Sequence, residues 1–470
     1  MKLRIAFFLC FLSLVSSGQS LKQRIETAYT AFEKDPQLKY AISSLTVLHS
    51  QTGEVLFSRN GNIGLAPAST LKTVTSATAY YLLGSDFAWK TNIGYTGRVN
   101  TGGVLNGDLI ITGGGDPTLG SWRYNKTQTK VIFDNWIDAI RKAGIKEIKG
   151  NIIADDSLFG TQTTPVGWTW QDMGNYYGAG PNSLTWRENQ VDITFQPGNN
   201  VGDATKLIRT VPDLSYLKIV NEVKTGKAGS GDNVYIYSAP YSDLIYLRGT
   251  YGIDLKKPIS GSIPDPAFEV AFRLQDTLNR IGIKTGLAAT TTRKMSFSTP
   301  LTSFNTTPIA TITSPALEQV VYWFNQKSVN LYGEHLLKTL AWKFGKEAST
   351  PEGVSVVQNF WKDKLSIDPD EINISDGSGL SPGNRITTSA MARILQYVKK
   401  EPWFKSYFES FPLYNDMKMK SGTISDVLGY TGYQTTSSGV PVTFSFIINN
   451  YNGSASSARQ KMFNVLNTLK

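Results

Sequence analysis

The pattern of hydrophobic and polar positions distinguishes the two ends of the chain from its middle stretch. Apolar residues at helical spacing predict helices over 21–34, 68–83, 315–324, 331–344, 388–399 and about 455–469. Alternating positions predict strands over 42–48, 54–58, 418–424, 429–435 and 440–449. From about 86 to 305 the pattern changes to short strands, such as 108–112 and 148–154, with Gly-rich turns and polar loops. The simplest layout is an α+β domain, an antiparallel sheet flanked by helices, built from both chain ends and interrupted by a large β-rich insertion.

The N-terminus has the pattern of a secretory signal peptide. A basic start, Met1–Arg4, precedes an apolar run, Ile5–Val15, and the small residues Ser16–Gly18. The run is shorter than the roughly 20 residues of a membrane span, and the one cysteine, Cys10, lies inside it. We therefore expect residues 1–18 to be removed and the mature protein to be exported to the periplasm or cell envelope.

The domain division follows from these two patterns. Residues 19–85 and 306–470 are expected to form one domain in two segments, and residues 86–305 an inserted domain of one or two subdomains.

Composition narrows the chemistry. The 47 Lys and Arg residues outnumber the 37 Asp and Glu residues, for a net charge of +10, but they form no run that marks a nucleic-acid patch. Contact of this basic protein with a membrane or wall surface stays open. The only histidines are His49 and His335, which argues against a multi-histidine zinc site, and a single cysteine argues against thiol catalysis. We expect no metal or cofactor, and no nucleic acid as partner.

A serine hydrolase with so few histidines needs another base, and a buried lysine is one. Ser69 and Lys72, in Ser69-Thr70-Leu71-Lys72, are three residues apart and so lie on one face of the predicted helix 68–83. Ser69 falls in the first helical turn, where backbone N–H groups favour an oxyanion. The pair is therefore a candidate nucleophile and base.

The same short motifs occur elsewhere, so spacing alone selects no site. Ser215-Tyr216-Leu217-Lys218 repeats the Ser-x-x-Lys spacing. Ser-x-Asn occurs at Ser58-Arg59-Asn60, Ser303-Phe304-Asn305 and Ser328-Val329-Asn330, and Lys-Ser/Thr-Gly at Lys224-Thr225-Gly226, Lys284-Thr285-Gly286 and Lys420-Ser421-Gly422. Context selects one trio: a serine that opens a helix, Ser328–Asn330 in a break between two helices, and Lys420–Thr423 on a strand before the last helix.

The order of these motifs resembles that of the penicillin-binding and serine β-lactamase fold. Nearly all of the mature chain is similar to the class C low-molecular-mass penicillin-binding proteins, the serine D-alanyl-D-alanine carboxypeptidase/endopeptidase family. Further segments that carry the resemblance are Gly113-Gly114-Gly115-Asp116-Pro117-Thr118-Leu119, Ala154-Asp155-Asp156-Ser157 and Asp376-Gly377-Ser378-Gly379-Leu380-Ser381. The large insertion between the first two motifs also belongs to that family's pattern.

The resemblance implies catalytic roles. Ser69 would attack the D-Ala-D-Ala peptide bond to form an acyl-enzyme, and Lys72 would take its proton. Ser328 would relay a proton toward the leaving amine, with Lys420 holding the local charge. Water would then release the acyl group, whereas a β-lactam would imitate the peptide and stay attached.

It also implies substrate-binding roles. Asn330 would bond the substrate amide, and the hydroxyls of Ser421 and Thr423 would hold the terminal carboxylate. The N–H groups of Ser69 and Thr423 would form the oxyanion hole. Peptidoglycan stem peptides and β-lactams are the implied partners; the oligomeric state and the balance of carboxypeptidase and endopeptidase action stay open.

Some positions depart from the family pattern. Val329 replaces the more common Asp or Asn, Ser421 replaces Thr, and Gly333-Glu334-His335 stands where Ala-Glu is common. His335 is left without a family role and is interpreted as a helix-surface or packing residue. His49 is interpreted as an ordinary strand residue.

Three features of the chain have both a functional and a purely structural interpretation. Asp172, in Trp168-Thr169-Trp170-Gln171-Asp172, resembles the family aspartate that binds the free amine of the stem peptide, or is a surface residue beside two packed tryptophans. Lys418 shares a strand face with Lys420 and either tunes its charge, binds substrate carboxylate or is solvated. The segment 376–381 is also compatible with a plain turn before a helix capped by Thr387.

Two other function classes stay open at this point. One is a β-lactamase or esterase of the same fold, for which a recognisable deacylating glutamate arrangement is missing. The other is a non-catalytic wall-binding or β-lactam-sensing module, against which stands the full set of hydroxyl and amine groups.

Overall fold

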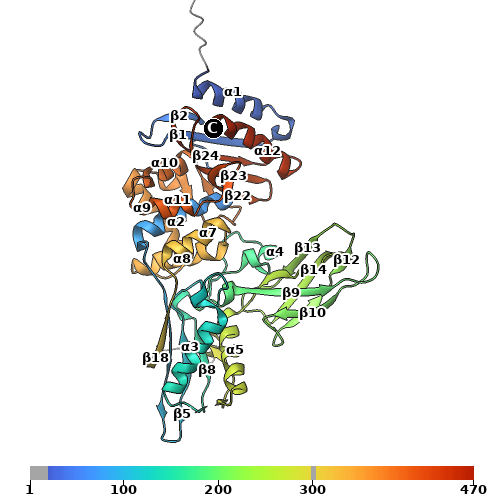
Figure 1. Cartoon of the computed structure of the whole chain (residues 1–470), viewed down its shortest axis with the longest axis vertical. Helices are drawn as coiled ribbons and strands as arrows, with labels where there is room; N and C mark the ends of the chain where they lie inside the picture. The colour runs from blue at the N-terminus through green and yellow to red at the C-terminus, as the bar shows by residue number, and fades with distance from the viewer. Residues whose placement is uncertain (1–18, 298–302) are drawn as a thin grey trace, which may run out of the picture.

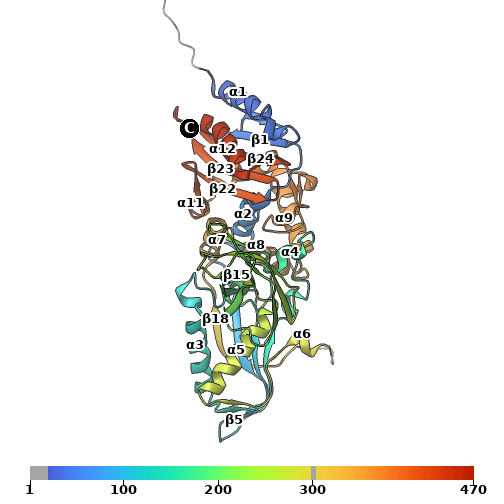
Figure 2. The same cartoon turned by 90° about the vertical axis from the view of Figure 1, so that its right-hand side faces the viewer.

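The structure is a computed structural model that describes residues 19–297 and 303–470. The predicted signal segment, residues 1–18, lies outside the described residues. Figure 1 shows an elongated molecule in which α1 (Leu21–Glu33) and α12 (Ala455–Leu466) lie together at one end. Figure 2, turned by 90°, shows an upper part that contains α1 and α12 and a lower part formed by the middle of the chain.

A six-stranded antiparallel sheet joins the two ends of the described chain. Its order is β2-β1-β24-β23-β22-β21, and β1 pairs with β24 from Ile42 opposite Asn449 to His49 opposite Val442. The bounds are β1 (Ile42–His49), β2 (Val55–Arg59), β21 (Leu413–Tyr414), β22 (Met417–Ile424), β23 (Val427–Thr435) and β24 (Pro441–Asn449). The predicted α+β fold class is confirmed.

Helices cover both faces of this sheet. On one face α1 and α12 bury Tyr29, Phe32 and Met462 against Phe444 and Phe446. On the other face a larger helical layer forms the main core. Its helices are α2 (Lys72–Leu83), α7 (Leu317–Gln326), α8 (Asn330–Lys343), α9 (Thr350–Leu365), α10 (Thr388–Val398) and α11 (Phe404–Glu409), with the two-stranded ribbon β19 (Ile372–Asn373) and β20 (Arg385–Ile386) beside them.

The first helix shows how local sequence sets these elements. Ser20 caps α1, accepting from the backbone N–H of Gln23 while the Gln23 side chain accepts from the N–H of Ser20. Ile25, Tyr29 and Phe32 then recur at helical spacing and are fully or almost fully buried. A capped start and one apolar face are sufficient to fix this helix on the sheet.

The middle of the chain forms a five-stranded sheet in the order β17-β8-β6-β3-β18 and a four-stranded sheet in the order β16-β7-β5-β4. Two long helices, α3 (Thr129–Lys142) and α5 (Pro266–Arg280), pack against these sheets. The sequence analysis expects only strands, turns and loops here, so both helices are a correction. In α3, Ile132, Trp136 and Ile140 recur every four residues, a helical signal that the surrounding Gly-rich strands obscured.

The strands of these two sheets are short. Their bounds are β3 (Lys90–Tyr95), β4 (Arg98–Val99), β5 (Val104–Asn106), β6 (Leu109–Thr112), β7 (Glu147–Ile148), β8 (Ile152–Asp155), β16 (Lys284–Thr285), β17 (Thr290–Thr291) and β18 (Thr307–Thr313), with α6 (Thr292–Met295) directly after β17. β18 pairs with β3 although it follows residue 305, the predicted end of the insertion. The division at residues 85 and 305 stays a prediction.

Two further sheets project to one side of the molecule (Figure 1). One has the order β10-β9-β15; in the other, β14 pairs with β11, β12 and β13. Their bounds are β9 (Gln190–Gln196), β10 (Lys206–Val211), β11 (Lys218–Asn221), β12 (Lys224–Gly226), β13 (Asp232–Tyr237), β14 (Leu244–Gly252) and β15 (Ile259–Ser262). Among the described residues, no helix has both the length and the apolar character needed to cross a membrane.

Candidate active site

Ser69 lies in a short turn of 3-10 helix, η2 (Ala68–Leu71), that leads directly into α2. Ala68, just before it, has a φ of 46° in the left-handed region, a conformation that costs of order 1–3 kcal/mol for a residue with a side chain. Gly379 packs on this turn so closely that an added Cβ would lie 1.9 Å from the carbonyl oxygen of Ala68. The turn that presents Ser69 is therefore held by the segment around Gly379.

Lys72, the first residue of α2, is fully buried next to Ser69. Its Nζ donates to Ser69 Oγ at 2.9 Å, Asn330 Oδ1 at 2.6 Å and the carbonyl oxygen of Ser378 at 2.6 Å. Burial lowers the pKa of Lys72 to about 7, against the opposing effect of the Asp376 and Glu334 charges. Near neutral pH this amine is therefore able to accept a proton from the serine hydroxyl that it touches.

A second serine and lysine lie nearby. Ser328, with a φ of 55°, stands in the break between α7 and α8. The Nζ of Lys420, on β22, donates to Ser328 Oγ at 3.1 Å and to the carbonyl oxygen of Ser421 at 2.8 Å. Burial, and then the charge of Lys72, hold the pKa of Lys420 well below its usual range. Two buried lysines thus each contact a serine hydroxyl.

The strand that carries Lys420 lies directly against the turn of Ser69. A Cβ added at Gly422 would lie 2.8 Å from the backbone nitrogens of Ser69 and Thr70. Only glycine permits this approach, which brings the β22 backbone beside the backbone N–H groups of Ser69 and Thr70. This contact is the physical reason that a glycine stands at the third position of Lys420-Ser421-Gly422.

These groups surround a cavity of about 570 Å³ between the helical layer, β22 and the middle of the chain. Its lining residues are Ser69, Thr169, Gln171, Asp172, Tyr176, Tyr177, Tyr235, Lys327, Ser328, Asn330, Leu380, Pro382, Thr423, Ile424 and Ser425. Of the predicted site residues, Ser69, Ser328, Asn330, Thr423 and Asp172 line it. Lys72 and Lys420 are buried in contact with lining serines, and Ser421 does not line the cavity but accepts from Lys420 through its carbonyl.

The duplicate motifs lie outside this cavity. Ser215 is exposed in the loop before β11. Lys224-Thr225-Gly226 is strand β12, and Lys284 with Thr285 is β16, each in a sheet other than that of β22. Element context, rather than the motif itself, distinguishes the site.

Asp172 sits in the short helix α4 (Trp170–Met173), at the wall of the cavity. Its Oδ2 accepts from the backbone N–H and the hydroxyl of Thr169, at 3.1 and 2.8 Å. Of the two neighbouring tryptophans Trp168 is buried, whereas Trp170 is half exposed. The carboxylate is thus fixed at the cavity wall by the cap of its own helix.

Sequence reasoning missed a buried acidic cluster beneath Lys72. Asp376 is fully buried, and its carboxylate accepts from the backbone N–H groups of Gly379 and Ser381, the amide of Asn384 and the indole N–H of Trp168, at 2.6–2.9 Å. Because a buried carboxylate needs such donors, Asp376 fixes the whole turn that follows it.

Glu334 completes this cluster from α8. Its fully buried carboxylate accepts from the backbone N–H groups of Gly377 and Ser378 at 3.0–3.2 Å. Burial, and then the neighbouring Asp376, raise the pKa of Glu334 to about 8. The segment 376–381 contacts Lys72 through the carbonyl oxygen of Ser378. Its only sequence signal was the resemblance of Asp376–Ser381 to the family. Thr387 does cap α10 as expected, accepting from the N–H of Ala390.

The other titratable residues considered in the sequence, His335, His49 and Lys418, lie outside the lining of the cavity. His335 is fully buried, with Nδ1 2.8 Å from the carbonyl oxygen of Gly115 and Nε2 2.9 Å from Thr185 Oγ1, and burial lowers its pKa to about 3. It is a packing residue, so the helix-surface alternative is wrong. His49 ends β1. Lys418 donates to the carbonyl oxygen of Phe411 at 3.0 Å, near the end of α11.

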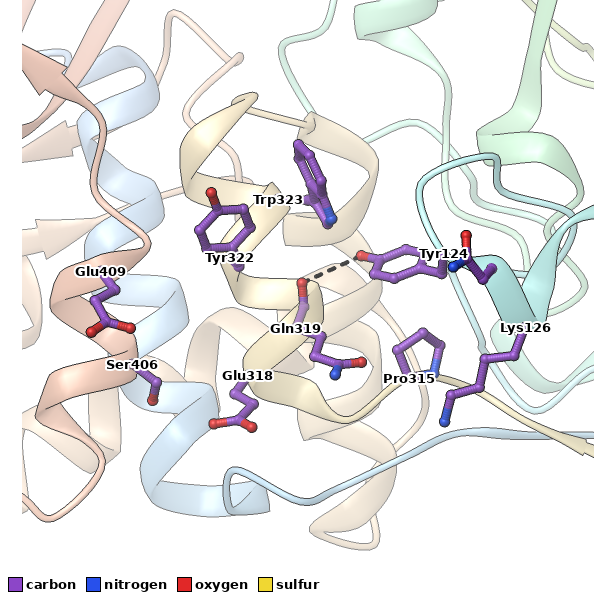
Figure 3. A pocket seen from close by; sticks show the side chains of 10 residues that line it. Tyr124, Lys126, Pro315, Glu318, Gln319, Tyr322, Trp323, Ser406 and Glu409 are labelled. Carbon is purple, nitrogen blue, oxygen red and sulfur yellow. Dashed lines mark hydrogen bonds between the residues drawn. The ribbon is translucent and has the colours of Figure 1, made fainter.

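A second cavity of about 500 Å³ lies beside α7, between α11 and the turn at residues 124–126 (Figure 3). It is lined by Tyr124, Asn125, Lys126, Pro315, Glu318, Gln319, Tyr322, Trp323, Ser406 and Glu409. The hydroxyl of Tyr124 donates to the carbonyl oxygen of Gln319 at 3.5 Å (Figure 3), and two carboxylates, Glu318 and Glu409, are among the lining residues. It contains none of the predicted site residues.

In residues 19–297 and 303–470, no group of three or more His, Cys, Asp or Glu side chains forms a metal site.

Comparison with known proteins agrees with this geometry. The profile of a family described as the D-Ala-D-Ala carboxypeptidase 3 (S13) family matches residues 25–469. The chain is 25% identical to the D-alanyl-D-alanine carboxypeptidase of an Actinomadura species, over 95% of this chain and 84% of that one. It is 22% identical to the D-alanyl-D-alanine carboxypeptidase DacB of Haemophilus influenzae, over 85% and 83%. The crystal structure of penicillin binding protein 4 from Haemophilus influenzae shares its fold, with a TM-score of 0.78 at 20% identity over 95% of this chain and 98% of that one.

Proposed function

The chain belongs to the D-Ala-D-Ala carboxypeptidase 3 (S13) family of serine-type D-Ala-D-Ala peptidases, and on this premise we propose which residues perform the reaction. The observation that carries the proposal is the 2.9 Å contact between Lys72 Nζ and Ser69 Oγ, with Lys72 fully buried. A lysine whose pKa is about 7 supplies the base that the two histidines of the chain do not.

Acylation begins with the hydroxyl of Ser69. Its Oγ attacks the carbonyl carbon of the D-Ala-D-Ala peptide bond while its proton passes to the neutral amine of Lys72. The negative charge that develops on the carbonyl oxygen is stabilised by the N–H groups of Ser69 and Thr423. Removal of one such donor costs about 3 kcal/mol in comparable sites. The approach of Gly422 to the backbone nitrogen of Ser69 supports this placement.

The leaving amine needs a proton as the C–N bond breaks. Ser328 donates its hydroxyl proton to the amine of the terminal D-Ala and regains one from Lys420, which it contacts at 3.1 Å. Lys72 has meanwhile gained the proton of Ser69, so one positive charge moves from one lysine to the other. This exchange fits the effect of the Lys72 charge, which lowers the pKa of Lys420 and so favours loss of the Lys420 proton. Water then attacks the ester carbon and its proton passes through Ser328 to Lys420, while Lys72 returns its proton to Ser69 Oγ as the shortened peptide leaves, so both lysines regain their starting charge.

Substrate is held by the polar groups around the cavity. Asn330 Nδ2 uses one of its two hydrogens on the carbonyl oxygen of Tyr177, at 2.8 Å, which leaves the other for the substrate amide. The hydroxyl of Thr423, which lines the cavity, binds the terminal carboxylate, and Asp172 binds the free amine of the stem peptide. The same role for the hydroxyl of Ser421 rests on the Lys-Ser/Thr-Gly motif alone. β-Lactams occupy the same place and acylate Ser69.

The crystal structure of the Haemophilus influenzae relative in complex with a novel β-lactam, with a TM-score of 0.74, supports binding of β-lactams by this chain. We place the enzyme outside the cytoplasmic membrane, after removal of residues 1–18. The hydrophobic run at 5–15 carries this assignment.

The test is release of D-Ala from diacetylated Lys-D-Ala-D-Ala by wild type, Lys72→Arg and Lys218→Arg. Arginine keeps the positive charge of Lys72 but does not deprotonate, so release should fall about 10²–10⁴-fold, the usual contribution of a general base. Lys218, from the duplicate motif, is the matched control and should tolerate the same change.

Three outcomes contradict the proposal. If Lys72→Arg releases D-Ala within tenfold of wild type, Lys72 is not the base. If both lysine variants fall equally, the change is not specific to the site. If wild type releases no D-Ala but consumes penicillin rapidly, the chain acts as a β-lactamase.

A further inference from the structure

Aromatic side chains lead out of the catalytic cavity onto the side sheet of β13 and β14. We call Trp170, Tyr176, Tyr235, Tyr237 and Tyr246 the aromatic face. Trp170 is 51% exposed, Tyr176 52% and Tyr235 41%, and the other two are half-buried. Exposed aromatic groups gathered in one place mark binding surfaces more often than scattered ones do.

Strand geometry places these rings on one side of the sheet. Along β13, Val234 and Ile236 are buried in the core, so Tyr235 and Tyr237 point to the opposite face. Tyr237 lies opposite Tyr246 on β14 in the antiparallel register. The rings therefore share a surface rather than a common core.

Neighbouring groups hold the rings in place. Trp170 packs edge-on against Tyr237, with ring centres 5.1 Å apart. The guanidinium of Arg248 lies over the rings of Tyr237 and Tyr246, at 5.5 and 5.3 Å, and its Nε donates to Glu222 at 2.6 Å. The face is thus pre-organised, with an arginine and a carboxylate at its outer end.

The aromatic face is continuous with the cavity. Tyr176 and Tyr235 line the cavity, and Trp170 lies on α4, the helix that also carries Asp172. In Figure 1 the β13–β14 sheet projects from α4 to one side of the molecule. A substrate that leaves the cavity on this side must pass over the aromatic face.

We propose that the aromatic face binds the sugar backbone of peptidoglycan, to which the stem peptide is attached; this rests on the proposed function of the cavity. A pyranose ring has C–H groups on its faces, which pack on aromatic rings, and hydroxyl and acetamido groups at its edge. The tyrosine hydroxyls and the Arg248–Glu222 pair supply partners for those polar groups. A peptide of four residues spans at most roughly 14 Å, so a sugar joined to a peptide in the cavity lies within reach.

The second cavity offers a contrast. Tyr322 and Trp323 give it an aromatic wall, but it is lined by two carboxylates and shares no lining residue with the catalytic cavity (Figure 3). Tyr322 is 40% exposed. It is therefore a matched control for the loss of an exposed tyrosine ring outside the aromatic face.

Direct binding tests the proposal independently of catalysis. In a Ser69→Ala background, a peptide-free tetrasaccharide of alternating N-acetylglucosamine and N-acetylmuramic acid is titrated by isothermal calorimetry. We expect binding that weakens at least tenfold in Tyr237→Ala/Tyr246→Ala and is unchanged in Tyr322→Ala. Tyr246→Phe, which keeps the ring, should bind within threefold, and circular dichroism melting shows whether each variant is folded.

The proposal is wrong if the tetrasaccharide does not bind, or if Tyr322→Ala weakens binding as much as the double variant. It is also wrong if a sugar-free stem pentapeptide displaces the tetrasaccharide from the Ser69→Ala parent, because the two would then compete for the catalytic cavity. Failure of the proposed function appears separately, as absence of D-Ala release by the wild-type enzyme.

Discussion

The rate at which penicillin acylates the enzyme should depend on pH through Lys72. Only the neutral amine accepts the proton of Ser69, and burial lowers the pKa of Lys72 from 10.5 to about 7. The rate should therefore fall about tenfold for each pH unit below 7 and stop rising above it. The perturbation is a change of pH alone, with no substitution in the site.

The magnitude follows from the size of the shift. A pKa lower by about 3.5 units corresponds to about 5 kcal/mol of differential stabilisation of the neutral amine. At pH 7 roughly half of a lysine with this pKa is neutral, compared with about three in ten thousand for an ordinary lysine. Burial of Lys72 thus raises the amount of usable base by roughly three orders of magnitude.

The assay is stopped-flow acylation by a fluorescent penicillin between pH 5 and 9, at constant ionic strength. A pH–rate profile that changes slope near pH 7 usually suggests a titrating histidine. His49→Asn is therefore the matched control, and it should leave the change of slope in place. His335 is no candidate, because burial holds its pKa near 3. A rate that is flat from pH 5 to 9, or one that still rises tenfold per unit at pH 9, would refute the role of Lys72.

Three substitutions test the surroundings of the site. Trp168→Phe removes one hydrogen-bond donor from the buried carboxylate of Asp376, so the free energy of unfolding measured with denaturant should fall by about 1.5–3 kcal/mol. The control Trp170→Phe, at an exposed ring, should change that free energy by less than about 0.5 kcal/mol. Equal changes in the two variants would contradict this role of Trp168. Gly422→Ala puts a methyl group 2.8 Å from the nucleophile's backbone nitrogen, so penicillin acylation should slow about 10–100-fold; an unchanged rate would show that β22 does not need this close approach. Asp172→Asn should raise KM about tenfold for a peptide with a free side-chain amine and leave KM for its acetylated form unchanged, whereas equal changes would exclude an ion pair with the amine.

The fold class and family were accessible from the sequence because their signals are local. Helix 68–83, the break at Ser328 and the strand of Lys420 are each defined by nearby residues, and the structure has these elements. The helices α3 and α5 were missed because the Gly-rich strands around them set the apparent pattern of residues 86–305.

The contacts that hold Lys72 and Asp376 in place were harder to predict from the sequence, for a physical reason. The carbonyl oxygen of Ser378 accepts from Lys72 across 306 positions of the chain, and a backbone carbonyl leaves no mark in the sequence. Asp376 belonged to a segment singled out by resemblance, but its partner Trp168 lies 208 positions away. Such contacts exist only after tertiary folding, so motif spacing does not predict them.

The central claim, that Ser69 is the nucleophile, is tested most directly by intact-mass spectrometry after incubation with penicillin. Ser69→Ala, Ser215→Ala and wild type are compared, since Ser215 begins the duplicate Ser-x-x-Lys motif. The account predicts a stable penicilloyl adduct on wild type and Ser215→Ala, and none on Ser69→Ala. An adduct that persists on Ser69→Ala, or one lost in Ser215→Ala, would contradict it.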